Sequence, residues 1–120
     1  MEKYVDGFVI PIAKENVEKY RAMAQKAGDI WMEKGALEYY ECVGDDLEIE
    51  NMLSFKTIAG ASDDETVIFA WIVFESREHR DTVNEAVMSD PRLKEDMEAG
   101  KNLFDFKRMA YGGFKTLVKL

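Results

Sequence analysis

The fold is decided by one stretch in the second half of the chain, Thr66-Val67-Ile68-Phe69-Ala70-Trp71-Ile72-Val73-Phe74. β-Branched and aromatic residues fill this stretch, and such residues favour the extended backbone of a strand. Successive side chains of a strand point to opposite sides, and here both sides are apolar. One side carries Val67, Phe69, Trp71 and Val73, and the other carries Ile68, Ala70, Ile72 and Phe74. We therefore predict a strand that is covered on both of its faces.

Further elements are predicted on both sides of this strand. Apolar residues spaced three and four apart indicate an amphipathic helix that Gly35 ends. Ser76 and Asp90 stand where helix N-caps belong, and Asp90 precedes a proline that is typical of a first helical position. The acidic segment 44–65 keeps no period and is predicted to be mostly loop. The full set is strands over Tyr4–Ile12, Leu37–Val43, Thr66–Phe74 and Arg108–Leu120, and helices over Glu15–Lys34, Arg77–Met88 and Pro91–Ala99.

This order of elements predicts a ferredoxin-like α+β fold. Two β-α-β units joined by a long connection form the split βαβ plan, a four-stranded antiparallel sheet with helices on one face. The 120 residues suffice for one such domain, spanning 1–120.

The second face of that sheet needs a cover of its own. The strand Tyr4–Ile12 is also apolar on both sides, and an exposed apolar patch of this size is one that monomers avoid. The sequence therefore predicts a homodimer packed sheet to sheet, because two-fold dimers are the commonest oligomers. The alternative is that the acidic segment 44–65 folds over the exposed face.

The net charge of −8 comes from one part of the chain. Residues 38–65 hold nine acidic groups and one basic group, Lys56, whereas the rest of the chain is balanced. This segment is either a solvated loop face or a surface for a cationic partner, and the stretch Lys101–Leu120, with five basic groups, is one candidate. Nucleic acid is not an expected partner, because phosphate binding requires a clustered basic surface.

The chain also predicts its compartment. A lone cysteine, Cys42, forms no internal disulfide and is typical of the reducing cytoplasm. No run reaches the ~18 apolar residues of a membrane span, and the N-terminus lacks the apolar core of a signal peptide. We therefore expect a soluble cytoplasmic protein with no membrane partner.

Several stretches resemble a known family. They are Tyr4–Pro11, Tyr20–Ala24, Gly35–Val43, Ala70–Phe74, Asp90–Arg92 and Lys107–Phe114, which ends in Tyr-Gly-Gly-Phe. Together they are similar to the YbaA-like family of small bacterial proteins over essentially the whole chain. The resemblance implies membership of the dimeric alpha-plus-beta barrel superfamily, in which two ferredoxin-like subunits join sheet to sheet. It implies no activity, because the family has no established biochemical function.

Two polar residues are candidates for catalysis. His79 is the one histidine, and histidine is the side chain suited to exchange protons near neutral pH; otherwise it is a surface residue at a helix start. Asp6 interrupts an apolar strand, where an aspartate needs a partner or a use. It lies either at a frayed strand start or in a cleft, there paired with Arg108 or Lys107.

Three aromatic residues are candidates for ligand contact, namely Trp31, Trp71 and Tyr111. Aromatic residues at such spacings most often pack in cores and interfaces, but a cleft lined by them suits a small apolar or aromatic ligand. In a ferredoxin-like subunit, we expect these three residues with His79 and Asp6 to border the space between helices and sheet.

No cofactor or metal is expected. The chain has no glycine-rich phosphate loop, no nucleophile elbow and no calcium-loop spacing. Haem-degrading members of the superfamily use a histidine in the later helical region, and here Arg92–Met97 contains none. The predicted function is a module that binds a small molecule or a protein. The alternative is a cofactor-independent enzyme, resembling the monooxygenases or isomerases of the superfamily, that acts on a small aromatic substrate in the cleft.

Overall fold

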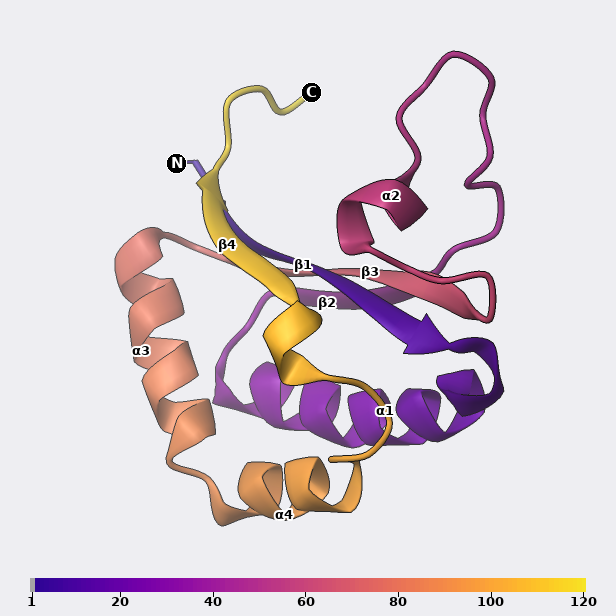
Figure 1. Ribbon diagram of the computed structural model, residues 1–120. Helices are drawn as coiled ribbons and strands as arrows, with labels where there is room; N and C mark the ends of the chain where they lie inside the picture. Colours follow the sequence, from indigo (N-terminus) through magenta and orange to yellow (C-terminus); the bar gives the residue numbers. More distant parts are fainter. Residues whose placement is uncertain (1) are drawn as a thin grey trace.

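The computed structural model describes residues 2–120 and contains a single four-stranded sheet within that range. The strands are β1 (Tyr4–Ala13), β2 (Glu38–Val43), β3 (Glu65–Phe74) and β4 (Ala110–Lys115), and the helices are α1 (Val17–Lys34), α2 (Phe55–Ala59), α3 (Arg77–Met88) and α4 (Pro91–Ala99). Short 3-10 turns, Lys14–Asn16 and Phe106–Arg108, precede α1 and β4. Helices α1, α3 and α4 lie against one face of the sheet (Figure 1).

The strand order is β2-β3-β1-β4, and every neighbouring pair is antiparallel. The two longest strands pair over their whole length, from Tyr4 opposite Phe74 to Ala13 opposite Glu65. This is the ferredoxin-like arrangement, so the predicted fold class is confirmed.

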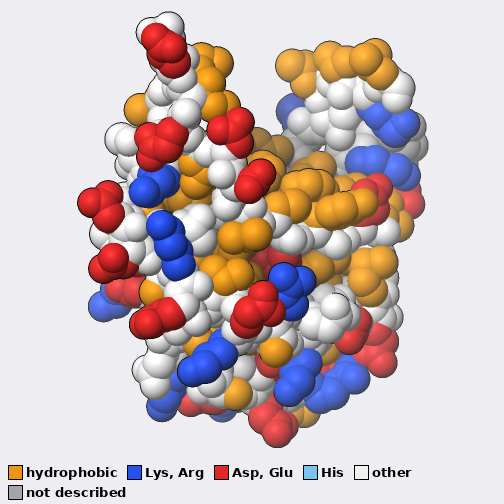
Figure 2. Space-filling model, turned by 90° about the vertical axis from the view of Figure 1, so that its right-hand side faces the viewer, with side chains coloured by type: hydrophobic (Ala, Val, Ile, Leu, Met, Phe, Trp, Pro, Cys, Tyr) orange, Lys and Arg blue, Asp and Glu red, His pale blue; other side chains and the backbone are white. Residues whose placement is uncertain are grey.

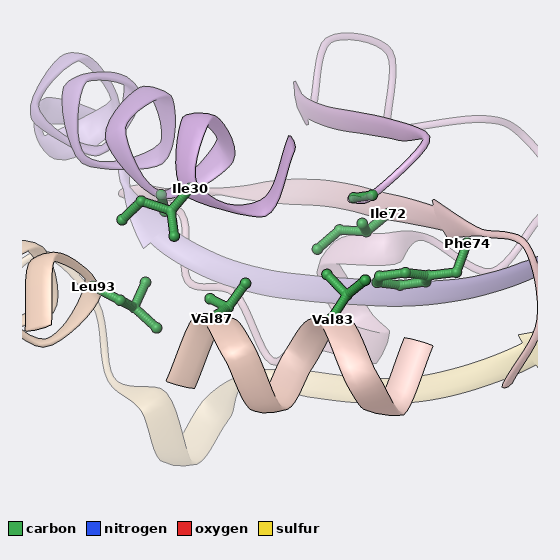
Figure 3. Packing of buried hydrophobic residues seen from close by; sticks show 8 residues of the cluster. Ile30, Ile72, Phe74, Val83, Val87 and Leu93 are labelled. Carbon is green, nitrogen blue, oxygen red and sulfur yellow. The ribbon is translucent and has the colours of Figure 1, made fainter. Parts of the chain in front are cut away.

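The core lies between the sheet and the helices. Val83 and Val87 of α3 point toward Ile72 and Phe74 of β3 (Figure 3), and each of the four is at most 2% exposed. Burying side chains of this size contributes roughly 1.5–3 kcal/mol each to folding. The core extends to Ile30 of α1 and Leu93 of α4, which lie beside these four residues.

The predicted helix boundaries hold at several ends. The Ser76 side chain accepts a hydrogen bond from the His79 amide, and the Asp90 side chain accepts one from the Arg92 amide. Each therefore satisfies a backbone donor that a helix start leaves free. Gly35 ends α1 with a φ of 119°, a left-handed conformation that favours glycine.

Two predicted elements differ from the structure. The acidic segment contains the helix α2, capped by Ser54 and ended by Gly60 at a φ of 69°. Its five residues are too few to establish a helical period, so the sequence indicated only a loop. The last strand ends at Lys115 instead of Leu120, because its pairing with β1 stops where Lys115 meets Tyr4.

The face of the sheet opposite α1, α3 and α4 is only partly covered, and we call it the open face. Helix α2 lies over one end of it, where Phe55 contacts Phe69 with ring centroids 5.9 Å apart. Much of this face is exposed all the same: Phe69, although it contacts α2, is 44% exposed, Tyr40 50% and Phe114 61%. Figure 2 shows hydrophobic side chains gathered between two projections at the top of the molecule. The acidic segment thus covers one end of the open face and leaves the remainder bare.

Among residues 2–120, none of the helices combines the length and the hydropathy that crossing a membrane requires.

Candidate functional site

A cavity of about 350 Å³ lies between the inner face of the sheet and helices α1, α3 and α4. Its lining is mainly apolar and includes seven aromatic residues and four methionines. The polar lining side chains besides the tyrosines and Trp31 are few: Glu41, Asn84 and Asp96. A volume of this size with few placed polar groups is typical of small-molecule sites.

Glu41 of β2 forms one polar group of the cavity. Its carboxylate accepts hydrogen bonds from the hydroxyls of Tyr20 at 2.7 Å and Tyr39 at 2.6 Å. Burial raises the pKa of Glu41, although the two phenol hydrogen bonds act in the opposite direction. Burial also raises the pKa of both tyrosines, and the charge of Glu41 raises it further. The two phenols therefore keep their protons and donate them to the Glu41 carboxylate.

Asp96 of α4 forms the second polar group. The residue is 8% exposed, and its Oδ2 is buried without a hydrogen-bond partner. Within residues 2–120, this is the one buried side-chain oxygen or nitrogen without a partner. Burial raises the pKa of Asp96, against the attraction of the Lys26 charge. An unpaired buried acceptor costs about 1–3 kcal/mol, and such a group in a folded protein calls for an explanation.

Asp6 of β1 is fully buried and anchors a hydrogen-bond network at another wall of the cavity. Arg80 Nη1 of α3 donates to its Oδ1 at 2.6 Å, and the Tyr111 hydroxyl of β4 donates to its Oδ2 at 3.0 Å. Asn84 Nδ2 donates to the same Oδ2 at 3.2 Å, and Trp31 Nε1 donates to Asn84 Oδ1 at 2.9 Å. The charge of Asp6 is therefore balanced by Arg80, and both of its carboxylate oxygens accept hydrogen bonds.

The structure corrects the expected partners of Asp6. Arg108 instead binds Glu65, with its Nη1 and Nη2 each 2.8 Å from a carboxylate oxygen, and donates to the Gly60 carbonyl. Lys107 lies in the turn before β4, where its backbone amide donates a hydrogen bond to Asp105 Oδ1. Asp6 is not at a frayed end, because it pairs with Ile72 on one side and Gly113 on the other.

The network and the cavity bring three of the five predicted site residues together. Trp31 and Tyr111 line the cavity, and Asp6 lies behind them, bound to the Tyr111 hydroxyl and to Asn84. The expectation that all five border one cleft is wrong for the other two.

Trp71 points to the open face, where its ring stacks on Tyr40 at 4.7 Å. It alternates along β3 with Ile72, whose side chain is on the helix side. His79 is not among the residues that line the cavity, because its ring folds back over the start of α3. There its Nδ1 accepts from the Glu75 amide at 3.0 Å, and its ring edge meets Phe74.

Two glycines make room for these side chains. A Cβ at Gly28 of α1 would lie 2.8 Å from the Tyr39 ring, closer than real Cβ contacts. A Cβ at Gly113 of β4 would lie 2.9 Å from Arg80 Nη1. The absence of side chains at these positions lets Tyr39 pack on α1 and lets Arg80 reach Asp6.

Four residues of the site were not predicted from the sequence, namely Glu41, Asp96, Asn84 and Arg80. Glu41 follows Tyr39 by two residues, which places both on the inner side of β2. Asp96 follows Leu93 by three residues, which places it on the buried side of α4. In both cases the available signal was a carboxylate at a position where the period of the strand or helix places apolar residues. Arg80 and Asn84 belong to the site because the tertiary fold brings α3 next to β1. The sequence carries no such signal for this contact.

No metal-binding arrangement of three or more His, Cys, Asp or Glu side chains occurs in the part of the chain that the structure describes. Glu41 and Asp96 are the ionisable carboxyl groups of the cavity, and desolvation raises the pKa of both. Chemically, the site can enclose an apolar molecule, hydrogen-bond one polar group and exchange a proton with it.

Comparison with known proteins places the chain among uncharacterised relatives. The family described as "Protein of unknown function (DUF1428)" matches residues 3–106. The "Uncharacterized protein YbaA" of Escherichia coli strain K12 is 42% identical over 116 residues, 97% of each chain, and the Shigella flexneri protein of that name matches equally.

Solved structures match the fold alone. A NIPSNAP family protein with unknown function from Agrobacterium tumefaciens superposes with a TM-score of 0.60 at 13% identity, covering 95% of this chain and 87% of the other. A NIPSNAP domain protein from Burkholderia xenovorans gives 0.57 at 13% identity, covering 98% and 94%. Because YbaA is similar over nearly its full length and the family pattern spans most of the chain, this protein belongs to the DUF1428 family, together with YbaA.

Proposed function

We propose that this protein is a cytoplasmic homodimer that binds a small, mainly apolar molecule in the cavity between helices and sheet. The cavity itself carries the proposal. It has a volume of about 350 Å³, and its lining consists mainly of aromatic and methionine side chains with a few polar groups among them. A concave apolar site of this volume with a few convergent polar groups is typical of ligand-binding sites.

The hydrogen-bond network of Asp6 would hold two walls of the cavity in place. Trp31 and Tyr111 present flat walls, and their polar atoms are already held by Asn84 and Asp6. A site whose side chains are held in place before binding loses less entropy when the ligand enters. The network of Asp6 is therefore proposed to position these walls rather than to touch the ligand.

The experiment replaces two alanines of the same helix, one at a time, by leucine. Ala27 of α1 lines the cavity, whereas Ala22 of α1 is exposed. We expect at least one compound of a panel of small apolar and aromatic molecules to raise the melting temperature of the unmodified protein and of Ala22→Leu. Ala27→Leu, which fills part of the cavity, should lose this response. A panel without any response, or an equal response in both variants, would contradict the proposal.

The homodimer is proposed from the open face. Phe69, Tyr40 and Phe114 are exposed there together, and exposed apolar patches of this kind mark interaction sites. A second copy with the same face is the simplest cover, because a two-fold contact needs one self-complementary surface. Light scattering at micromolar concentration should give about twice the 13.8 kDa of one chain. A mass of one chain throughout that range would exclude the dimer.

One observation favours an enzyme as the second candidate. Glu41 is held by two phenols at the cavity, and burial raises its pKa, as is common for general acids and bases. The reaction would be a cofactor-independent proton transfer, as in an isomerase, or an oxygenation of a small aromatic substrate. A substrate that is turned over by the unmodified protein, and bound without turnover by Glu41→Gln, would establish it. Binding without any turnover would exclude it for that compound.

A further inference from the structure

The charges of the cavity all have the same sign. Its lining includes two carboxyl groups, Glu41 and Asp96, and among the described residues that line it there is no Lys, Arg or His. We propose that the ligand is a small organic cation, an aromatic or apolar molecule that carries a protonated amine or amidine. This inference rests on the proposed binding function and adds the chemical class of the ligand.

The unpartnered oxygen of Asp96 is the first observation that points to a cation. Its Oδ2 is buried and accepts no hydrogen bond from the described protein atoms. A protonated amine has N–H donors, and a hydrogen bond from a cation to a carboxylate is about twice as strong as one between neutral groups. A cationic ligand therefore supplies what this carboxylate lacks.

Glu41 offers further hydrogen-bond acceptor sites at the same end of the cavity. A carboxylate has about four lone-pair sites, and the hydroxyls of Tyr20 and Tyr39 use two of them. Both carboxyls line the cavity together with Tyr39, whose hydroxyl donates to Glu41 and whose pKa is raised by burial and by the charges of Glu41 and Asp96. The two groups thus form one acidic end of an otherwise apolar cavity.

The aromatic walls are the second observation. Rings attract cations through their negatively polarised faces, and Trp is the strongest of them. Trp31 and Tyr39 lie together at this cavity, with ring centroids 6.0 Å apart, and Tyr39 also binds Glu41. Aromatic faces combined with a carboxylate are the arrangement by which proteins hold organic ammonium groups.

The nearby basic groups do not cancel this preference. Arg80 does not line the cavity, and its guanidinium is bound by Asp6 and Asp81. Lys26 attracts Asp96 from a neighbouring hollow between α1 and α4, which Asp96 also borders, and Lys26 does not line the cavity itself. An anionic ligand would meet two carboxyls without a free cation, so carboxylates and phosphates are disfavoured.

The test uses three compounds with the same ring and different charges: phenethylamine as the cation, phenethyl alcohol as the neutral analogue and 3-phenylpropionate as the anion. Calorimetric titration at pH 7 should give the amine at least about tenfold tighter binding than the alcohol, with the anion weaker than both. Asp96→Asn should remove about tenfold of the amine affinity and leave the alcohol unchanged.

A neighbouring carboxylate provides the control. Glu95 of α4 is exposed and does not line the cavity, so Glu95→Gln removes the same charge nearby and should change neither affinity. Unfolding curves establish that Asp96→Asn is folded, and Asp96→Leu serves as a second variant with the same expected loss.

The possible failures are distinct. If the alcohol or the anion binds as tightly as the amine, or if Asp96→Asn and Asp96→Leu keep the amine affinity, the cation inference is overturned while the cavity remains a binding site. If the amine does not bind at millimolar concentration, the cation inference is overturned. The proposed function is overturned as well only if the neutral panel also leaves the melting temperature unchanged.

Discussion

The two faces of the sheet are built from the same strands and differ in what covers them. Along β3, Ile72 on the helix side is 2% exposed, whereas Phe69 on the open face is 44% exposed. The helix side contains the buried carboxylate of Asp6 and the half-buried carboxylate of Glu41, each held by a donor from a helix. The middle of the open face carries stacked rings such as Trp71 on Tyr40. Apolar residues on a face of the sheet thus predict that other residues cover that face. Polar residues among them indicate that the face also forms a binding site.

The largest expected effect comes from placing a charge on either face of β3. Ile72→Lys buries an ammonium in the core and should lower the free energy of unfolding by at least about 4 kcal/mol, which unfolds many domains. Phe69→Lys places the same charge on the open face and should leave a folded monomer. Circular dichroism and light scattering measure the two results. Equal loss of structure in both variants would contradict the difference between the faces.

The next effect concerns the buried network. Asp6→Asn removes the buried partner of Arg80, whose side chain is 12% exposed, and should cost about 3 kcal/mol because this guanidinium then keeps only the exposed carboxylate of Asp81. The exposed pair of Lys3 and Glu75 is the control, and Glu75→Gln should cost less than about 1 kcal/mol. Urea unfolding compares them. Similar losses would show that Asp6 has no special role.

A smaller effect is expected at the glycine that admits Tyr39. Gly28→Ala adds a methyl group 2.8 Å from the Tyr39 ring and should destabilise the protein by about 1–3 kcal/mol. It should also weaken ligand binding, since Tyr39 lines the cavity. Gly112→Ala is the matched control, because its Cβ would lie 3.8 Å from Phe114 on the open face. An unchanged affinity in Gly28→Ala would exclude Tyr39 from the binding site.

The smallest effect is a pH dependence of opposite sign in two carboxyls. Burial raises the pKa of Glu41, so its contribution to stability is present below pH 4.5 and is lost as the pH rises through the raised pKa. Hydrogen bonds from Arg108 lower the pKa of Glu65 to about 2, so its contribution is present above pH 4.5 and is lost as the pH falls toward 2.

Unfolding midpoints between pH 2 and 8 test both directions. Glu41→Gln should flatten the decline on the alkaline side, and Arg108→Gln should flatten the decline on the acid side. Identical pH profiles for a variant and the unmodified protein would contradict the environment assigned to that carboxyl.

Much of the fold was predictable because its signals are local. The two-sided apolar strands, the caps at Ser76 and Asp90, and the stop at Gly35 depend on neighbours within a few residues. The helix α2 was not predictable, because five residues between Ser54 and Gly60 carry no measurable period.

The site was predictable only in part. Trp31, Tyr111 and Asp6 were singled out by residue type, and the structure joins them through Asn84. Trp71 was misplaced because the sequence does not say which face of β3 the helices cover. Asp96 was missed because an aspartate in a charged helix is ordinary, and its burial depends on how α4 packs against α1.

The most direct test of two faces with two roles uses the two tryptophans as separate reporters. Trp71→Phe leaves Trp31 in the cavity, and Trp31→Phe leaves Trp71 on the open face. Fluorescence of each variant is measured on adding phenethylamine and on diluting the protein from micromolar to nanomolar concentration. We predict that Trp31 responds to the amine and not to dilution, and that Trp71 responds to dilution and not to the amine. A response of Trp71 to the amine without one of Trp31, or dilution that leaves Trp71 unchanged, would contradict the account.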